Sequence, residues 1–147
     1  MIEPKIVNKP WGYELWIADG KRTPYASKKI FFRAGNRTSL QAHEHKFETN
    51  YVIEGTGILL ISKLHFNCKL FSKGNMSQER IDEVINSLES FELKPGAIFD
   101  IIPGHLHRVI ATTDLTFFET STLEVDDVVR VEDDTNRGNG RIDEEHK

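Results

Sequence analysis

The sequence of 147 residues has a single cysteine, Cys68, and no surplus of positive charge. One cysteine excludes an intrachain disulfide, so the fold cannot depend on the cross-links that stabilise many small secreted domains. The formal net charge is -4, whereas proteins dedicated to nucleic acids or anionic membranes carry clustered positive charge. We therefore expect no nucleic-acid partner and no membrane partner, although a local basic pocket for a phosphorylated small molecule remains compatible with this charge.

The sequence also lacks a long apolar run. Its first residues, MIEPKIVNKPWGYE, contain no apolar core of a signal peptide. No apolar stretch approaches the roughly 20 residues that span a bilayer. These absences predict a cytoplasmic protein without a membrane anchor. Hydrophobic residues make up 38% of the chain, which is enough for one domain, because a chain of about 150 residues buries roughly two-thirds of its unfolded surface.

What the sequence does contain is a succession of short strand patterns. They are rich in Ile, Val, Phe and Thr, and turn-forming Gly, Pro, Asn or Asp separates them. The predicted strands are 28–33, 39–45, 50–54, 57–62, 90–93, 98–102, 107–111 and 115–120. So many closely spaced strands favour an all-β sandwich or barrel.

Two segments depart from this pattern. Within SQERIDEVINSLES, apolar residues recur at the spacing of one helix face, and Ser77 or Asn75 could cap the helix start. We predict an insertion, 64–90, whose short helix plugs an open end of the barrel. The polar segment 136–147 has one large apolar residue, Ile142. We expect it to be a tail that is mobile, or ordered only against another subunit, beyond a domain that covers 1–135.

Candidate metal ligands lie in the stretch LQAHEHKFETNYVIEG, residues 40–55. Alternate residues of a strand share one face, so Gln41, His43 and His45 point the same way if the segment is extended. His43 and His45 form one possible pair of ligands, and Gln41 and His43 form another. An isolated pair of this kind is also common on a protein surface, so the pair needs support from elsewhere in the chain.

One spacing fits the second pair. Gly35 is followed by five residues, Gln41, one residue, His43, four residues, Glu48, six residues and Gly55. This order resembles the first motif of the cupin superfamily, G-x5-H-x-H-x3,4-E-x6-G, with glutamine in place of the first histidine.

A later segment resembles the second cupin motif, G-x5-P-x-G-x2-H-x3-N. Gly96, Gly104 and His107 stand at its intervals, while Pro103 is displaced by one place and Ala111 replaces the asparagine. The resemblance implies a single cupin domain, that is, a double-stranded β-helix or jelly-roll barrel.

The resemblance also implies a ligand set, namely Gln41, His43, Glu48 and His107. Two imidazoles, one carboxylate and one amide suit a divalent ion, zinc first, with Mn, Fe, Co or Ni as alternatives. The ion would keep a net positive charge and could polarise a carbonyl or hydroxyl oxygen.

A closer resemblance rests on an ordered series: KPWGYE, RTSLQAHEH, EGTG, GHLHR and DDVVRVEDD. The series is similar to the cupin domain of type II mannose-6-phosphate isomerases, over about residues 5–135. This implies metal-dependent aldose–ketose isomerisation of a sugar phosphate through an enediolate. Two features depart from the family: Thr49 and Asn50 stand where it has His-Trp, and the insertion is unexpected.

Proton transfer and phosphate binding need further residues. Candidate bases are Lys28, His45 and His105, together with a metal-bound hydroxide. Lys28 shares strand parity with Ile30 and Phe32, so we expect it to face the interior.

Arg37 and Arg108 are the candidate phosphate partners. Arg108 directly follows His107, however, so strand parity turns it to the opposite face. Trp11 could line the pocket or pack at the barrel end.

Other functions remain open at this point. The same scaffold also suits a sugar epimerase, a metal-dependent dioxygenase, or a non-catalytic sugar-binding or regulatory cupin. Cupin relatives commonly form dimers, so we expect a homodimer, with residues 1–10 and the tail after Val131 as its contact regions.

Overall fold

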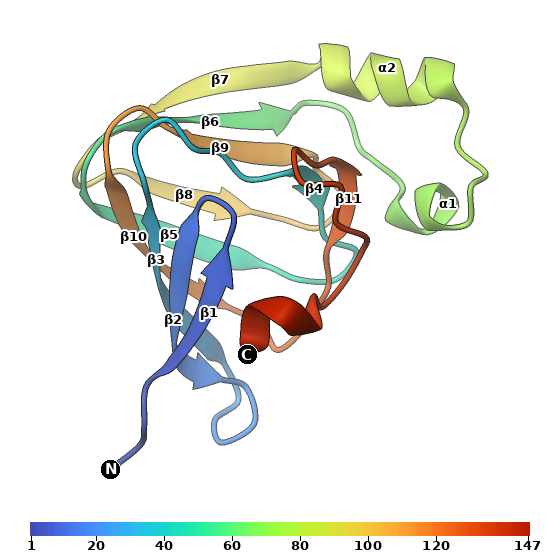
Figure 1. The fold of residues 1–147 in the computed structure, drawn as a ribbon. Coiled ribbons are helices and arrows are strands. Elements are labelled where there is room, and N and C mark those ends of the chain that lie inside the picture. Colours follow the sequence, from blue (N-terminus) through green and yellow to red (C-terminus); the bar gives the residue numbers. More distant parts are fainter.

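The computed structural model describes residues 1–147, and it consists mainly of two antiparallel β-sheets (Figure 1). The larger sheet has the strand order β1-β2-β3-β10-β5-β8. Its strands are β1 (Lys5–Lys9), β2 (Gly12–Asp19), β3 (Ala26–Phe32), β5 (Glu48–Glu54), β8 (Ile98–Ile101) and β10 (Leu115–Ser121). The smaller sheet has the order β11-β4-β9-β6-β7. Its strands are β4 (Leu40–Ala42), β6 (Gly57–Ser62), β7 (Leu88–Leu93), β9 (His107–Ala111) and β11 (Val129–Glu132). The prediction of an all-β fold is confirmed.

The two sheets enclose the main apolar core, and strand alternation decides which side chains enter it. On β3, the burial pattern alternates, so Lys28, Ile30 and Phe32 are buried while the residues between them are half-buried. The expected inward orientation of Lys28 is therefore confirmed. Along the chain from Lys28 to Phe32, the inward side chains change from charged to apolar. The barrel interior is thus polar at one end and apolar at the other.

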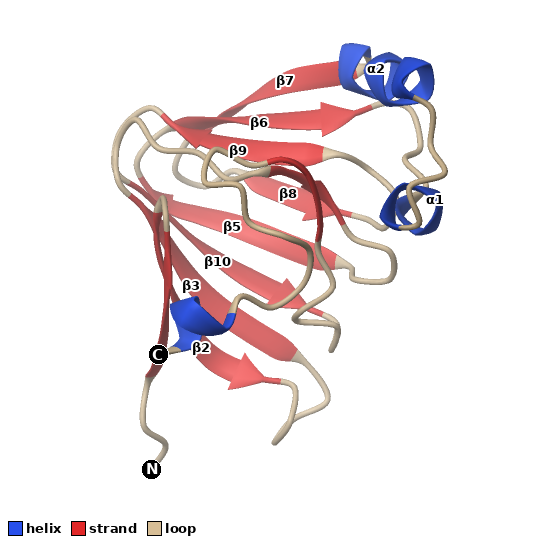
Figure 2. Ribbon diagram, turned by 45° about the vertical axis from the view of Figure 1, so that its right-hand side comes forward, coloured by secondary structure: helices blue, strands red, loops and turns tan.

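The insertion forms a second, smaller core outside the cavity. It contains α1 (Cys68–Ser72) and α2 (Gln78–Asn86), of which only α2 was predicted, and the Ser77 hydroxyl caps α2 by accepting a hydrogen bond from the Arg80 amide. This core joins buried side chains of the two helices, of β4 and β11, and of the loops before α1 and β9: Leu40, Ala42, Phe66, Cys68, Val84, Leu106 and Val129. Figures 1 and 2 place both helices far from the two chain termini. None of the helices is both long and apolar enough to cross a membrane.

The C-terminal segment, which was predicted to be mobile or ordered only against another subunit, contacts its own chain in the structure. It ends in a short 3-10 helix, η1 (Asp143–His146), in which Glu145 is 8% exposed. Glu145 accepts hydrogen bonds from Lys9 at 2.7 Å and from Arg137 at 3.0 Å. His146 packs edge-on against Trp16 of β2, with ring centroids 5.3 Å apart. Ion pairs and one aromatic contact with the same chain therefore hold a segment that has little apolar surface of its own.

Gly55 shows why a glycine stands at the end of the first motif. Its φ is +86°, in the left-handed region, and an added Cβ would overlap the carbonyl group of Asp114. Only glycine accepts both conditions without strain. The close approach brings the end of β5 to the start of β10.

Candidate metal centre

His43 lies just beyond β4, with its side chain 4% exposed. Its Nδ1 lies 2.5 Å from the backbone carbonyl of Asp127, so Nδ1 carries the proton and donates it to that oxygen. The other ring nitrogen, Nε2, then carries the lone pair and lies 4.0 Å from Oε2 of Glu48. A backbone acceptor that fixes the tautomer in this way is typical of histidines that bind metals.

His107, the first residue of β9, repeats this arrangement. Its Nδ1 lies 3.0 Å from the carbonyl of His105, and its Nε2 is buried without any hydrogen-bond partner. The rings of His43 and His107 lie 4.9 Å apart, centroid to centroid. Two imidazoles thus present free Nε2 atoms toward one space. An unpartnered buried nitrogen is costly unless a ligand uses it.

Glu48 completes a three-residue cluster that fits a metal ion. Ligand atoms of His43, Glu48 and His107 all lie within 4.8 Å of one another. Two neutral nitrogens and one carboxylate are a common ligand set for a catalytic zinc or a similar ion, with a further position left for water or substrate. The cluster could therefore hold a metal ion, and the geometry does not select which one.

Gln41 lines the same cavity as this cluster and is the cross-strand partner of His107. Its Oε1 accepts a hydrogen bond from the Ser39 hydroxyl at 2.5 Å. A fourth ligand bond from Gln41 would use the remaining lone pair of this oxygen. Its role as a metal ligand stays a prediction.

Burial lowers the pKa of both histidines. The pKa of His43 falls well below 6.5, and that of His107 falls to about 4, chiefly because burial disfavours the charged imidazolium. Both rings are therefore neutral at pH 7, which is the form that binds metals.

We expect the metal-free protein to lose stability as the pH falls from about 6.5 to about 4. Over this interval the unfolded chain binds a proton at residue 107 that the folded protein excludes, so the free energy of unfolding falls. The lowering of the pKa of His107 from 6.5 to about 4 corresponds to a loss of about 3 kcal/mol in the free energy of unfolding. Urea unfolding with chelator at several pH values measures the slope. His107→Gln should flatten it, whereas His45→Gln should not, and identical slopes for all three proteins would contradict the assignment.

A chain of buried charges continues from Glu48 across the larger sheet. The Lys46 ammonium lies 2.9 Å from Glu48 and 3.2 Å from Glu119 of β10. Lys28 lies 4.0 Å from Glu119 and 3.5 Å from Glu14 of β2. Opposite charges alternate along this chain, so each group has a counter-ion despite its burial.

These neighbours shift the pKa values in opposite directions. Burial opposes ionisation of Glu48, but the Lys46 ammonium, a hydrogen bond with Glu119 and the charge of Lys28 together lower the pKa of Glu48. Burial, together with the charge of Glu48, raises the pKa of Glu119. The two carboxylates raise the pKa of Lys46 although burial lowers it. Lys46 is therefore a permanent cation beside the candidate metal ligands, and Glu119 is the carboxyl that accepts a proton more readily.

The three predicted bases occupy different environments. Lys28 lines the cavity and is 3% exposed. The side chain of His45 is 67% exposed, beside Glu44, and does not line the cavity. His105 binds the carbonyl of Ser62 through Nδ1 at 2.8 Å and also lies outside the cavity. His45 and His105 therefore lie away from the space that a molecule bound at the metal centre would occupy.

The predicted substrate contacts divide in the same way. Trp11 lines the cavity wall and stacks on Phe32 at 4.1 Å. The Arg37 guanidinium forms an exposed pair with Asp134 at 2.9 Å. Arg108 is buried on the other face of β9, where it donates to the carbonyl of Thr38. Neither arginine lines the cavity.

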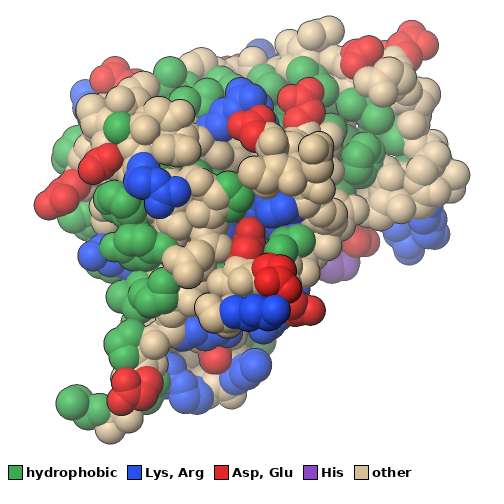
Figure 3. Space-filling model, in the orientation of Figure 1, with side chains coloured by type: hydrophobic (Ala, Val, Ile, Leu, Met, Phe, Trp, Pro, Cys, Tyr) green, Lys and Arg blue, Asp and Glu red, His purple; other side chains and the backbone are tan.

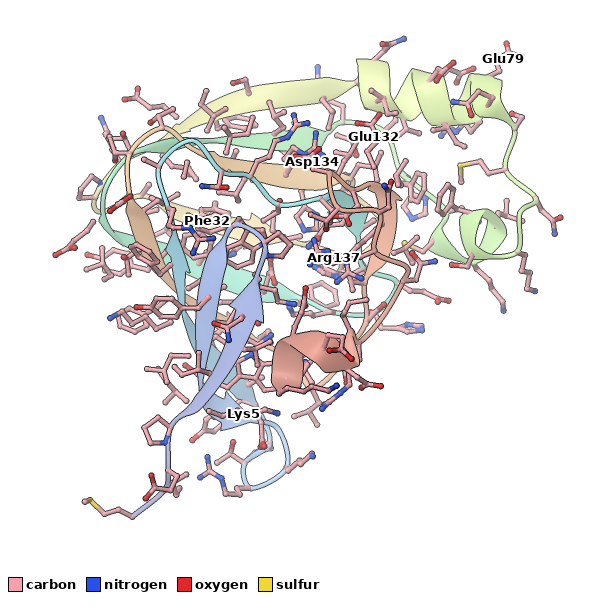
Figure 4. All side chains as sticks on the ribbon, viewed as in Figure 1. Lys5, Phe32, Glu79, Glu132, Asp134 and Arg137 are labelled. Carbon is pink, nitrogen blue, oxygen red and sulfur yellow. The ribbon has the colours of Figure 1, made fainter.

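Four cations that the sequence did not point to line the cavity instead, beside the C-terminal segment. Arg130 of β11, together with Arg137 and Arg141, lines the cavity from the C-terminal side, and Lys9 lines it from β1. Figure 3 shows basic and acidic side chains close together at the centre of the view, where Figure 1 places β11 and η1. Arg137, labelled in Figure 4, lies near η1. The sequence signal that could have indicated these cavity cations is the concentration of arginine in the final segment.

Comparisons with known proteins identify the architecture. No family model and no curated protein sequence matches the chain. Many solved structures are similar, and three of them illustrate the range. The capsular polysaccharide assembling protein CapF from Staphylococcus aureus has 14% identity and a TM-score of 0.65, over 90% of this chain and 32% of that chain. Ectoine synthase from P. lautus has 13% identity and a TM-score of 0.59, over 80% and 68%. Oxalate decarboxylase from Bacillus subtilis, described with Mn(II) centres, has 16% identity and a TM-score of 0.62, over 86% and 30%.

These neighbours are cupin-fold proteins, and several are enzymes by name. The chain forms a single cupin β-barrel domain, as its motifs predicted. It spans about a third of the length of CapF. Identities this low show the fold alone, and none of these three proteins is named as a sugar-phosphate isomerase. One fold can carry many different functions, so the residues of the site decide the function of this chain.

Proposed function

We propose that this chain is a metal-dependent aldose–ketose isomerase that acts on a sugar phosphate, in the manner of mannose-6-phosphate isomerase. One observation carries the proposal. The free Nε2 atoms of His43 and His107 converge with Glu48 in a cavity that also holds a buried carboxyl, Glu119, and a buried ammonium, Lys46.

Isomerisation moves a proton between two neighbouring carbons of the substrate. A divalent ion held by His43, Glu48 and His107 would supply a Lewis acid that stabilises negative charge on the substrate oxygens. Glu119 is not a ligand in this set, and its carboxylate, paired with Lys46 and Lys28, would take the proton from one carbon and return it to the next. Lys46 keeps Glu48 ionised and adds a fixed positive charge beside the reacting atoms.

The phosphate would lie at the mouth rather than inside the barrel. The cavity has a volume of about 100 Å³, whereas an engineered cavity that binds benzene has a volume of about 150 Å³. A hexose phosphate is much larger, so only its carbonyl end fits. By the mouth we mean the side of the cavity where the C-terminal segment lies. There, Lys9 and Arg137 each form an ion pair with one carboxylate oxygen of Glu145. A phosphate would take the place of this carboxylate, and the C-terminal segment would move aside.

The direct test is exchange with solvent. Metal-loaded protein with mannose 6-phosphate or fructose 6-phosphate in deuterated water should interconvert the two and lose the C2 proton, as followed by proton NMR. Chelation and His43→Ala should each abolish both signals. Glu145→Gln should lower KM without lowering kcat, because it weakens a competitor for Lys9 and Arg137. Bound metal without any exchange would refute the isomerase proposal.

The small volume of the closed cavity favours a second candidate. A substrate of only a few heavy atoms, such as a small carboxylic acid, fits without any movement of the C-terminal segment. The function would then be a metal-dependent reaction on that acid. Turnover of oxalate or glycolate, followed by oxygen consumption or carbon dioxide release, distinguishes this candidate from the isomerase.

A further inference from the structure

Asn50 is the cavity-lining residue whose two side-chain polar atoms are both buried without a partner. The residue is 0% exposed. A buried amide without hydrogen bonds costs about 1–3 kcal/mol. Most buried amides in folded proteins avoid this cost by bonding to backbone or to other side chains. The amide of Asn50 has neither kind of partner, which points to a ligand.

The position of Asn50 in the sheet shows where such a ligand would lie. On β5 it is two residues beyond Glu48, on the same face, and hence roughly 7 Å farther along the strand. Its cross-strand partner on β10 is Glu119. The next inward residues on these two strands, Val52 and Phe117, belong to the apolar core. Asn50 therefore stands between the candidate metal centre and an apolar floor.

We infer that Asn50 is a specificity-determining residue that hydrogen-bonds a hydroxyl group of the molecule bound at the metal centre, a few carbon atoms from the metal-binding end. The inference rests on the proposed function only in placing a small molecule at that centre. It goes beyond the resemblance, because the family has tryptophan at this position.

The chemistry of the amide selects the kind of group. An amide offers a donor and an acceptor side by side, and a hydroxyl can satisfy both. A second carboxylate or a phosphate would satisfy only the donor and would lie beside the buried carboxyl of Glu119. A bare alkyl chain would leave both atoms unsatisfied. The favoured ligand is thus a hydroxylated chain with one metal-binding end, such as a sugar or a hydroxy acid.

Butyrate and 4-hydroxybutyrate test this inference, because both are four-carbon carboxylates and only the second carries a hydroxyl group, which is too far from the carboxylate to form a stable chelate ring with the metal. Calorimetry with metal-loaded protein should show 4-hydroxybutyrate bound about tenfold more tightly than butyrate. Asn50→Leu should bind the two alike while its ligand-free Tm is no lower than that of the wild type, since it removes an unsatisfied amide. Asn50→Ala serves the same comparison if leucine prevents folding. Tyr51→Leu, on the outward face of β5, is the matched control and should keep the preference.

Three results would overturn the inference: no preference in the wild type, an unchanged preference in the Asn50 variants, or a Tm lowered by several degrees in both variants, which would mark a structural amide. None of these measurements needs turnover. Preference without isomerisation would therefore refute only the proposed reaction, and isomerisation without preference would refute only the role of Asn50.

Discussion

Replacement of His107 by alanine should lower the affinity for zinc or manganese by more than about 100-fold. Changes to groups that merely support a ligand already cost roughly 10–100-fold, and His107 would itself be a ligand. Its Nε2 has no other partner in the folded protein. Competition with a chelating dye measures the affinity directly, and the result does not depend on knowing the substrate.

The chain supplies matched controls for this experiment. His105 lies two residues before His107, and its side chain does not line the cavity, so His105→Ala is the control for His107→Ala. The backbone carbonyl that holds Nδ1 of His107 survives that substitution. His43→Ala and His45→Ala form a second pair of the same design. Equal affinity losses in both members of a pair would contradict the assigned ligands.

Replacement of Lys46 by methionine should destabilise the metal-free protein by about 3–5 kcal/mol at neutral pH. Removal of one partner of a buried ion pair leaves an uncompensated charge, and losses of this size are typical. Here two carboxylates, Glu48 and Glu119, would face each other without their shared ammonium. Bound metal would neutralise Glu48, so the loss should be smaller in the metal-loaded protein.

Urea unfolding with chelator and with metal measures both losses. Adding Glu119→Gln to Lys46→Met removes one of the stranded charges and should restore part of the stability. Lys63→Met is a suitable control, because its ammonium is exposed and only loosely paired with Glu89. Equal losses with and without metal would mean that Lys46 contributes packing rather than charge compensation.

The regular strands were predictable because their patterns are local. The predicted strands 57–62 and 107–111 match β6 and β9 at both ends. In contrast, β11 and the C-terminal segment depend on distant partners. The first pairs with β4, and the second is held by Lys9 and Arg137. A repeat of apolar residues within a short segment cannot predict contacts between residues that are far apart in the sequence. Strands β1 and β2 were missed although β2 buries Trp16 and Ala18 on one face.

The candidate site was half predictable for a similar reason. The predicted strand 39–45 ends at Ala42 in the structure, and the chain then turns. Beyond Ala42, strand alternation therefore no longer predicts which side chains face the cavity. His43 and Lys46 face inward while His45 faces solvent. Motif spacing still identified the cluster of His43, Glu48 and His107, because it depends on the whole barrel rather than on one strand.

The separate core of the insertion gives the lone thiol a use as a reporter. Cys68 is 3% exposed, and burial raises its pKa to about 11, so it is inert while that core is closed. Its cluster shares no residue with the core around the cavity. A local opening of the insertion would expose the thiol while the barrel stays folded. The rate of thiol labelling, compared with the rate of global unfolding, thus separates the motions of the two parts of one small domain.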